Sequence, residues 1–282
     1  MNTRAPSTSS KYYTNSNVQN YISDWIISFV LLVYFFSIAE HANPFQRQFL
    51  ITDLSISHPF AIEERVSGVA CILLAAFVPL AIISLVVILK AYGEKYKTKS
   101  DPLHVFQVSI LGLSLSIFLD GVITDILKNW IARPRPDFLA RCGAQIEGHI
   151  NELVDLSVCS APLGELLLLD GLRSTPSGHS SISFVAFLYL TLWLLGQFKL
   201  FNSTPQYMYK YILSFMPLLL ATYIALSRVQ DYRHHFIDII LGSILGCTIA
   251  VMVYFHYWNN LQSDTCDTPK SFKTPTDTIL PL

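Results

Sequence analysis

Long uncharged stretches of mostly apolar residues alternate with shorter polar segments along the chain. Six such stretches cover residues 25–39, 66–89, 105–119, 180–198, 211–227 and 239–255. A hydrocarbon core about 30 Å thick needs roughly 20 helical residues, and each stretch reaches that length once its flanks are included. Membrane-spanning strands would show short alternating segments instead. The pattern therefore predicts an all-α integral membrane protein with six transmembrane helices. The alternative, in which one or two weaker stretches are helices of a soluble core, fits the lengths less well.

Composition and charge narrow the class of protein. Hydrophobic residues make up 52% of the chain and charged residues only 14%, whereas soluble domains contain roughly 25% charged residues. The formal net charge is −1 and the sequence contains no basic run, so nothing in it indicates a nucleic-acid partner. Residues 1–21 and 259–282 are polar and poor in apolar side chains, and we expect both ends to be disordered. Residues 22–258 then form a single membrane domain.

The distribution of Lys and Arg predicts the orientation in the membrane. The short loop between the second and third stretches carries Lys95, Lys97 and Lys99, with Lys90 just before it. Short loops weigh most in the positive-inside rule, so we expect this loop and both termini to be cytosolic. The loops after the first, third and fifth stretches should then face the lumen or the exterior.

Two expectations follow from this orientation. The sequon at Asn202 lies between the fourth and fifth stretches, on the cytosolic side, where no glycan should be attached. Cys142 and Cys159 share one extracytoplasmic loop, 17 residues apart, and disulfides form in oxidising compartments. We predict a disulfide between them, with two free thiols as the alternative.

The loop after the third stretch carries chemically versatile residues at both of its ends. KNWIARPRPDF begins at Lys128 and holds Arg135 between two prolines, which end the helix and leave both cations beside the membrane surface. STPSGHSS, residues 174–181, stands directly before the fourth stretch. A helix start offers free N–H groups and a positive dipole end, and Gly allows a ligand to approach the backbone closely, which together suit a phosphate. Taken singly, these segments are also typical of interfacial cations and of a capped helix with a surface histidine.

The loop after the fifth stretch supplies SRVQDYRHHFID, residues 227–238. If the sixth helix begins near His234, then His234 and Asp238 lie at i and i+4 on one helix face. The carboxylate would accept a hydrogen bond from one imidazole nitrogen and leave the other with a lone pair for attack. The alternative is an interfacial His–Asp pair without catalytic function. His235 would point away as an interfacial or supporting residue, and Asp231 and Arg233 would pair with each other.

The three segments form one pattern, because the third to sixth helices bring all of them to the same membrane face. The pattern is Lys128, six residues, Arg135 and Pro136; then Pro176, Ser177, Gly178 and His179; then Ser227, Arg228, five residues, His234, three residues and Asp238. In these motifs, residues 128–136, 176–179 and 227–238, the chain resembles the type 2 phosphatidic acid phosphatase superfamily. PFQRQFLITDLSISHPF, in the first extracytoplasmic loop, resembles in particular the fungal diacylglycerol pyrophosphate phosphatases.

This resemblance implies a role for each matching residue. His234 would be the nucleophile that takes the phosphoryl group, Asp238 would orient it, and His179 would protonate the leaving oxygen. The non-bridging oxygens would be held by Lys128, Arg135, Arg228, Ser177 and the backbone N–H of Gly178. Phosphoryl transfer needs mainly positioning and charge stabilisation, and members of the superfamily work without a divalent metal. We therefore expect no metal site and no cofactor.

The resemblance also implies a function. The chain would be a magnesium-independent lipid phosphate phosphatase that converts diacylglycerol pyrophosphate to phosphatidate and phosphatidate to diacylglycerol, and also acts on lysophosphatidate, through a phosphohistidine intermediate. Its active site would lie at the extracytoplasmic face of an endomembrane (vacuolar or ER/Golgi) or of the plasma membrane, with membrane phospholipids as partners. The alternatives are a phosphotransferase or sugar-phosphate phosphatase on the same scaffold, and an anion or lipid transporter. Transporters tend to contain repeats with matching broken helices, and this chain has no internal repeat. The preferred headgroup, the membrane and the oligomeric state stay open.

Other motifs have structural explanations. Asp125 lies three residues before Lys128 and is expected to pair with it rather than to relay protons. Gly242 and Gly246 have the small-xxx-small spacing of a close helix contact. LGELLLLDGL, residues 163–172, is too short to span the membrane, and we interpret it as an interfacial lid over the lipid entry.

Overall fold

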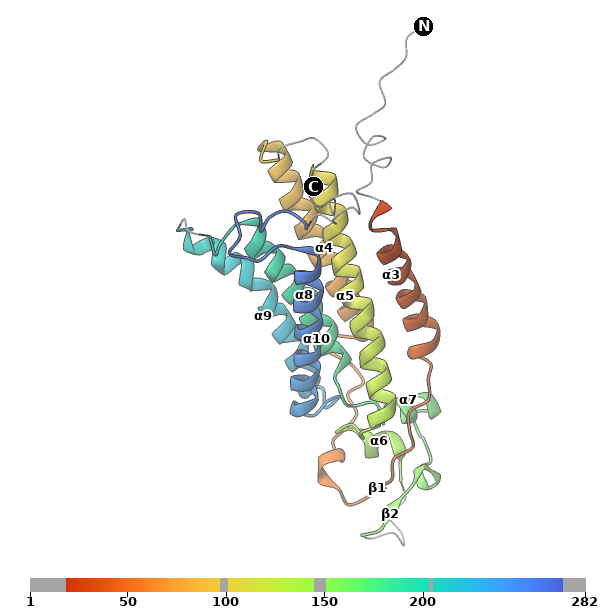
Figure 1. The fold of residues 1–282 in the computed structure, drawn as a ribbon. Helices are drawn as coiled ribbons and strands as arrows, with labels where there is room; N and C mark the ends of the chain where they lie inside the picture. Colours follow the sequence, from red (N-terminus) through yellow and green to blue (C-terminus); the bar gives the residue numbers. More distant parts are fainter. Residues whose placement is uncertain (1–18, 97–100, 145–150, 203–204, 271–282) are drawn as a thin grey trace, which may run out of the picture.

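The structure is a computed structural model that describes residues 19–96, 101–144, 151–202 and 205–270. Its main elements are six long helices gathered in one elongated bundle (Figure 1). They are α3 (Ile22–Tyr34) with its π-helical continuation η1 (Phe35–Ala39), α4 (Gly68–Tyr92), α5 (Asp101–Ile131), α8 (Gly178–Gln197), α9 (Met208–Gln230) and α10 (Phe236–Tyr257). All six are long and apolar enough to cross a membrane. The predicted six-helix membrane fold is confirmed, and the chain is a multi-pass membrane protein.

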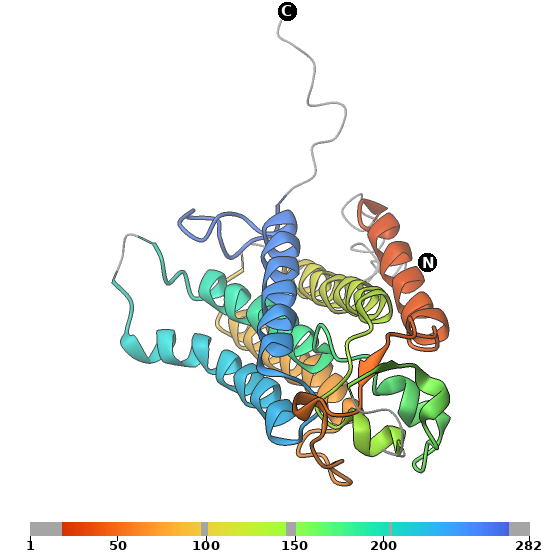
Figure 2. The ribbon, with the colours of Figure 1, turned by 90° about the horizontal axis from the view of Figure 1, so that it is seen from below.

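The helix α8 lies at the centre of the bundle. It packs against α10, α9, α5 and α4, and 78% of its membrane-spanning window is buried. The peripheral helix α3 packs mainly on α5, and only 17% of the span Ile22–Ala39, formed by α3 and η1, is buried. The view along the bundle in Figure 2 shows α8 enclosed by its neighbours and α3 at the edge. Residues at the start of α8 are therefore held from several sides.

Close contact between α8 and α10 depends on two glycines of α10. A Cβ atom on Gly242 would lie 2.4 Å from the carbonyl oxygen of Ser177, and one on Gly246 would lie 2.3 Å from that of Ser181. The small-residue contact expected from the sequence is confirmed. Because α10 approaches so closely, the backbone N–H of Ser177 donates to the carbonyl of Asp238 at 3.0 Å. The starts of the two helices that carry the second and third motifs are thus fixed to each other.

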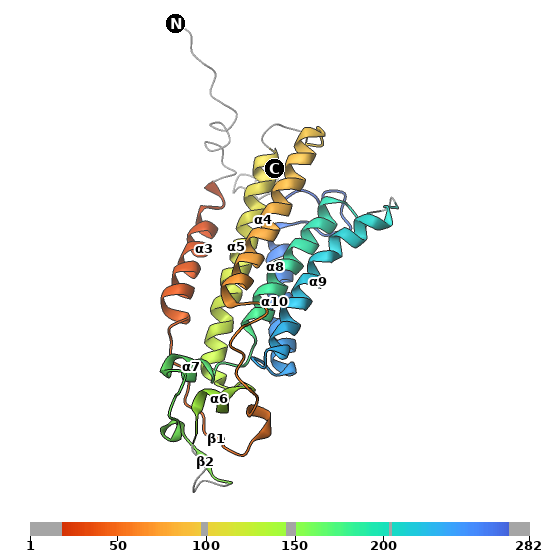
Figure 3. The same cartoon turned by 180° about the vertical axis from the view of Figure 1, so that it is seen from behind.

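A loop-rich layer, here called the cap, covers one end of the bundle and consists of residues 40–67, 132–144 and 151–177 (Figures 1 and 3). Its short elements are β1 (Phe49–Leu50), η2 (Leu54–Ile56), α6 (Phe138–Cys142), β2 (Leu153–Val154), η3 (Leu156–Val158) and α7 (Glu165–Asp170). The strands β1 and β2 pair antiparallel and join the two parts of the cap. Cys142 and Cys159 form a disulfide, as predicted. The cap also has a small apolar core of its own, which includes Phe49, Phe138 and Leu168.

The helix α7 lies within the segment that we interpreted as an interfacial lid. Leu168 on α7 is buried in the apolar core of the cap, whereas Leu166 is 85% exposed. The carboxylate of Asp170, at its end, binds the guanidinium groups of Arg135 and Arg141. The observed contacts of α7 are therefore those of a support for the cap and for Arg135.

The chain after α10 differs from the expected disorder. Residues 258–270 fold back across the end of the bundle opposite the cap, where Lys90 and Lys199 both bind the carboxylate of Asp267, at 3.2 and 3.1 Å. The side chain of Cys266 is fully buried there. The polar composition from residue 259 onwards predicts disorder. Composition carries no information about ion pairs with residues more than sixty positions away, and these pairs hold the segment in place. Residues 1–18 and 271–282 lie outside the described part of the chain.

Candidate active site

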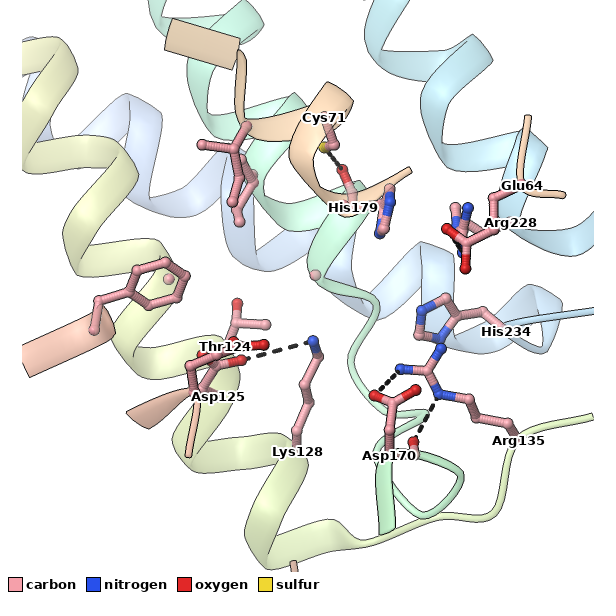
Figure 4. Close-up of a pocket in the computed structure, with 17 residues that line it drawn as sticks. Glu64, Cys71, Thr124, Asp125, Lys128, Arg135, Asp170, His179, Arg228 and His234 are labelled. Atoms are coloured by element: carbon pink, nitrogen blue, oxygen red, sulfur yellow. Dashed lines mark hydrogen bonds and ion pairs between the residues drawn. The ribbon is translucent and has the colours of Figure 1, made fainter. Parts of the chain in front are cut away.

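One cavity of about 240 Å³ lies where the bundle meets the cap (Figure 4). Its wall contains six of the eight residues that the motifs assign to the site: Lys128, Arg135, Gly178, His179, Arg228 and His234. The other two, Ser177 and Asp238, are fully buried and do not line the cavity. The three motifs, which are far apart in the sequence, therefore meet at one place.

Arg135 is held in place by hydrogen bonds to Asp170, another residue of the cap. Its Nε donates to the carbonyl of Asp170 at 2.9 Å, and its Nη2 donates to the carboxylate of Asp170 at 2.8 Å. Burial lowers the pKa of Arg135 to about 10, although Asp170 opposes this effect, so the guanidinium stays charged at neutral pH. Burial alone would raise the pKa of the Asp170 carboxyl, but the charges of Arg135 and Arg141 hold that pKa well below its usual range. Asp170 is therefore ionised, and it fixes the position of Arg135 in the cavity wall.

The side chain of Lys128 extends from the last turn of α5 towards the start of α8. Its Nζ lies 3.6 Å from the carboxylate of Asp125, so the expected local ion pair is confirmed. A Cβ atom on Gly178 would lie 2.7 Å from Nζ of Lys128. Glycine at this position therefore leaves room for the ammonium group beside the backbone N–H groups at the helix start, an arrangement that suits an anion.

His234 is buried and has a defined tautomer. Its Nδ1 lies 2.7 Å from the carbonyl oxygen of Ser174, and a carbonyl only accepts hydrogen bonds, so Nδ1 carries the proton. The lone pair is then on Nε2 of a ring that lines the cavity. Burial and the nearby charges of Arg135, Lys128 and Arg228 hold the pKa of His234 well below its usual range. At neutral pH in the unliganded site the imidazole is neutral, which is the state a nucleophile requires.

The expected hydrogen bond between His234 and Asp238 is wrong. The helix α10 begins at Phe236 with His235 as its N-cap, so His234 precedes the helix and does not share a face with Asp238. The Asp238 carboxylate instead accepts hydrogen bonds from the hydroxyls of Ser174 (2.6 Å) and Thr175 (2.5 Å), from Arg133 (2.9 Å) and from the backbone N–H of His235 (3.0 Å). Asp238 thus fixes the segment whose carbonyl holds His234, and any orienting effect passes through Ser174.

Ser177 does not occupy the phosphate-binding position that the motif implied. Its hydroxyl caps α8 by accepting from the backbone N–H of Ser180 at 3.4 Å, and its side chain is fully buried. The first turn of α8 still reaches the cavity through Gly178 and His179. In this arrangement Ser177 shapes the helix start and does not face the cavity itself.

His179 and Arg228 meet at a carbonyl of the first cap segment. Nη1 of Arg228 donates to the carbonyl oxygen of Val66 at 2.7 Å, and Nε2 of His179 lies 3.2 Å from the same oxygen. Nη2 of Arg228 also lies 3.2 Å from the carboxylate of Glu64. The two motif residues are therefore positioned by a loop that belongs to none of the three motifs.

The expected pair between Asp231 and Arg233 is also wrong. Asp231 binds Arg65, through both its backbone N–H and its guanidinium. Arg233 binds Asp137 at 3.0 Å and Glu64 at 2.9 Å. Both residues connect the motif loop to distant parts of the cap, so they fix the position of the loop that carries His234.

Sequence reasoning missed the residues of the cap that hold the motif side chains. Two signals were available in the sequence: the charged run EER before α4, and Asp170 near the end of LGELLLLDGL. Neither has a motif spacing that indicates a partner. The missed residues are Glu64, Val66, Arg133, Asp170 and Ser174. Among the described residues, no three His, Cys, Asp or Glu side chains are grouped closely enough to hold a metal ion.

A family model described as the PAP2 superfamily matches residues 109–262, which contain all three motifs. The chain is 43% identical to diacylglycerol pyrophosphate phosphatase 1 of Saccharomyces cerevisiae over 219 residues, 77% of this chain and 72% of that protein. It is 38% identical to the probable diacylglycerol pyrophosphate phosphatase 1 of Schizosaccharomyces pombe over 253 residues, 88% of this chain and 85% of that protein.

The similarity extends beyond the fungi. Lipid phosphate phosphatase 2 of Arabidopsis thaliana is 30% identical over 240 residues, 84% of this chain and 77% of that protein. No solved structure matches the chain. These matches confirm the resemblance that the three motifs and the first cap segment indicated.

Proposed function

The chain belongs to the PAP2 superfamily, and from this premise we propose that it is a lipid phosphate phosphatase acting on diacylglycerol pyrophosphate, phosphatidate and lysophosphatidate. Two of the similar proteins carry diacylglycerol pyrophosphate phosphatase in their names and a third is named a lipid phosphate phosphatase. We further propose that the reaction passes through a phosphohistidine, that it requires no divalent metal and that the active site faces away from the cytosol.

The observation that carries the lipid substrate is the mixed lining of the cavity. Besides the charged residues and histidines, it includes less polar residues of four membrane helices: Phe35, Gly68, Cys71, Ile72, Gly121 and Ile182. A phosphorylated lipid would place its headgroup at the cations and its glycerol and upper acyl chain against the less polar residues. A soluble sugar phosphate would gain nothing from the less polar residues, so the lining favours a lipid.

In the proposed reaction, Nε2 of His234 attacks the terminal phosphorus and the bond from phosphorus to the leaving oxygen breaks. His179 gives its proton to that oxygen, and a covalent phosphohistidine remains. Water then attacks the phosphohistidine, with His179 taking a proton from the water, and inorganic phosphate leaves.

The cations of the cavity would hold the non-bridging oxygens throughout this reaction. Lys128, Arg135 and Arg228 come from three different elements and face one space, so together they can surround a phosphoryl group whose charge is spread over three oxygens. The backbone N–H of Gly178 adds a donor at a helix start. Such stabilisation requires no divalent ion, and the activity should persist in a chelator.

Purified protein assayed on a panel of phosphate esters tests the proposal. Diacylglycerol pyrophosphate and phosphatidate should be hydrolysed equally well with and without EDTA, and glucose 6-phosphate should be a poor substrate. His234→Ala should reduce every activity to background because it removes the nucleophile. Turnover that requires magnesium, or that survives His234→Ala, would refute the mechanism, and a preference for the sugar phosphate would refute the substrate class.

We also propose that the cap faces the lumen or the exterior, since the lysines of the loop at residues 91–100 favour a cytosolic location for the opposite end. Asn202 lies at that opposite end and should carry no glycan. A mobility shift that a glycosidase removes and that Asn202→Gln abolishes would instead place the active site in the cytosol.

A further inference from the structure

The loop directly before α4, residues 58–66, is built tightly into the cap although none of the three motifs includes it. The backbone N–H of His58 donates to the carbonyl of Pro136 at 2.9 Å. The ring of Phe60 contacts two guanidinium groups, with Cζ of Arg233 4.2 Å and Cζ of Arg141 5.1 Å from its centroid. These contacts fix the loop against the two segments that carry the first and third motifs.

The loop brings one carboxylate to the cationic side of the cavity. Glu64 lines the cavity, and its side chain is 24% exposed there, whereas that of Arg228 is 1% exposed. Oε2 of Glu64 lies 3.2 Å from Nη2 of Arg228, and Figure 4 shows the two side chains facing each other beside His234. A negative charge therefore stands where the proposed function requires a negatively charged substrate.

The contacts of Arg228 indicate which of its N–H groups a phosphate would use. Nη1 is bound to the carbonyl of Val66, and Nη2 is bound to Glu64. Nε is buried and has no hydrogen-bond partner among the described residues. Phosphates bind guanidinium groups best through two parallel hydrogen bonds, and the remaining edge is the one formed by Nε and Nη2. A phosphate on that edge would compete with Glu64 for Nη2.

A second arginine offers Glu64 an alternative position. Oε1 of Glu64 lies 2.9 Å from Nη2 of Arg233, and Nε of Arg233 is also buried without a hydrogen-bond partner in the described part of the chain. The carboxylate can therefore leave Arg228 and form two hydrogen bonds with Arg233 without losing its charge partner.

We propose that Glu64 is an internal competitor for the phosphate-binding edge of Arg228. In the unliganded site its carboxylate is shared between Arg228 and Arg233, and a bound phosphoryl group displaces it onto Arg233. Three cations in a buried cavity would hold the product, inorganic phosphate, tightly, and the nearby carboxylate weakens that binding and speeds release of the product. This inference rests on the proposed function, since it assigns the phosphate of the substrate to Arg228.

Glu64→Gln tests this role, because glutamine keeps the size and hydrogen-bonding capacity of the side chain but removes its charge. Glu63→Gln is a matched control, since Glu63 is the neighbouring residue, is exposed and does not line the cavity. The measurement is the affinity for inorganic phosphate, both as inhibition of lipid hydrolysis and as thermal stabilisation of the purified protein without lipid. Removal of one charge a few ångströms from the bound anion should tighten phosphate binding on the order of ten-fold, with a parallel fall in KM and no gain in kcat. Glu63→Gln should bind phosphate as the wild type does.

A residue that merely positions Arg228 would give the opposite sign. If Glu64→Gln binds phosphate more weakly than the wild type, or equally well, the proposal is overturned. Should Glu64→Gln fail to fold, Glu64→Asp decides in the same assays, because the shorter carboxylate keeps its charge but reaches Arg228 less readily. Tighter phosphate binding by Glu64→Asp supports competition, and unchanged or weaker binding contradicts it. Because phosphate binding is read without lipid, a wild type that binds phosphate but does not hydrolyse lipids would refute the proposed function and leave this test interpretable.

Discussion

The bundle and the cap are held together by different forces, and both are needed to build the cavity. In the bundle, apolar side chains and close glycine contacts set the position of the helices, as at Gly242 and Gly246. In the cap, ion pairs, guanidinium–ring contacts and a disulfide connect segments with little regular structure. A membrane interior offers no water to drive helices together, so small-residue packing dominates there. Charged groups at the membrane surface can instead form specific networks.

This difference shows which region of the molecule positions each residue of the site. Lys128, His179 and Arg228 stand on the ends of bundle helices, so their approximate positions follow from helix packing. The cap then fixes the final orientation of His179 and Arg228 through the Val66 carbonyl and that of its own Arg135 through the Asp170 carboxylate. It also holds His234 through the Ser174 carbonyl, whereas Lys128 pairs with Asp125 of its own helix. Changes in the bundle should therefore affect stability, whereas changes in the cap should affect turnover at nearly constant helix content.

After His234→Ala, the largest effect is expected at His179, which the bundle carries and the cap orients. His179→Ala removes the proposed proton donor, so the loss should depend on the leaving group. Phosphatidate must expel an alkoxide, and general acid assistance of that kind contributes roughly 10²–10⁴-fold. Diacylglycerol pyrophosphate expels a phosphate monoester whose second pKa is about 6, and it should lose much less. Single-turnover rates on both substrates check this. Equal losses would mean that His179 binds the phosphate and does not donate the proton.

The disulfide comes next and concerns the cap alone. Replacing Cys142 and Cys159 together by serine removes a crosslink with a sequence separation of 17, worth roughly 3 kcal/mol on the chain-entropy model. Activity should be lost at a lower temperature while the circular dichroism of the helices persists. Cys247→Ser, at a free cysteine of α10, serves as the control. Simultaneous loss of activity and helix signal in the double variant would contradict the independence of the two regions.

A substitution in the bundle should instead lower the thermal stability of the helices. In Gly246→Ala the new Cβ would meet backbone atoms of α8, at 2.3 Å from the Ser181 carbonyl oxygen and 2.9 Å from the Val185 nitrogen, and backbone cannot move aside cheaply. Overpacking of this kind costs about 1–3 kcal/mol, so the thermal midpoint of the helices in detergent should fall. Gly93→Ala, at the end of α4, has its nearest contact at 3.3 Å and should unfold close to the wild type. An unchanged midpoint for Gly246→Ala would show that the two helices are not held in close contact.

The smallest expected effect is on turnover and arises at Asp170. Asp170→Asn leaves Arg135 without its ionised anchor, and kcat/KM should fall by roughly ten-fold, a typical cost for a hydrogen bond to a charged group. Glu165→Gln, at the exposed start of the same helix, should have no effect.

The pH dependence of the contribution made by Asp170 follows from the pKa of its carboxyl group. Since that pKa is held below its usual range, the contribution of Asp170 is fully present above about pH 4 and disappears only as pH falls through the lowered value. The ratio of wild-type to Asp170→Asn activity should therefore be constant from about pH 5 to 8. A ratio that changes within this range would mean that Asp170 titrates there and is not a permanent anchor.

Much of the fold could be predicted from the sequence because its determinants are local. Apolar length alone locates six helices, and the spacing of Gly242 and Gly246 predicts that the last of them packs closely on another helix. The disulfide between Cys142 and Cys159 follows from their shared loop. The three motifs could likewise be recognised as one site, since the order of the helices places them at the same end of the bundle. All of these properties depend on residues near one another in the chain or on the alternation of helix direction.

Only the tertiary structure decided how the motif side chains are held. Where α10 begins depends on His235 as an N-cap and on Asp238 binding Ser174 and Thr175, about sixty residues earlier, and this places His234 outside the helix. The partners of Arg228 and Arg135, Glu64 and Asp170, lie 164 and 35 positions away. A helix can be read from its own residues because its hydrogen bonds are local. An ion pair between two loops exists only once packing has brought them together, so its partners carry no periodic signal in the sequence.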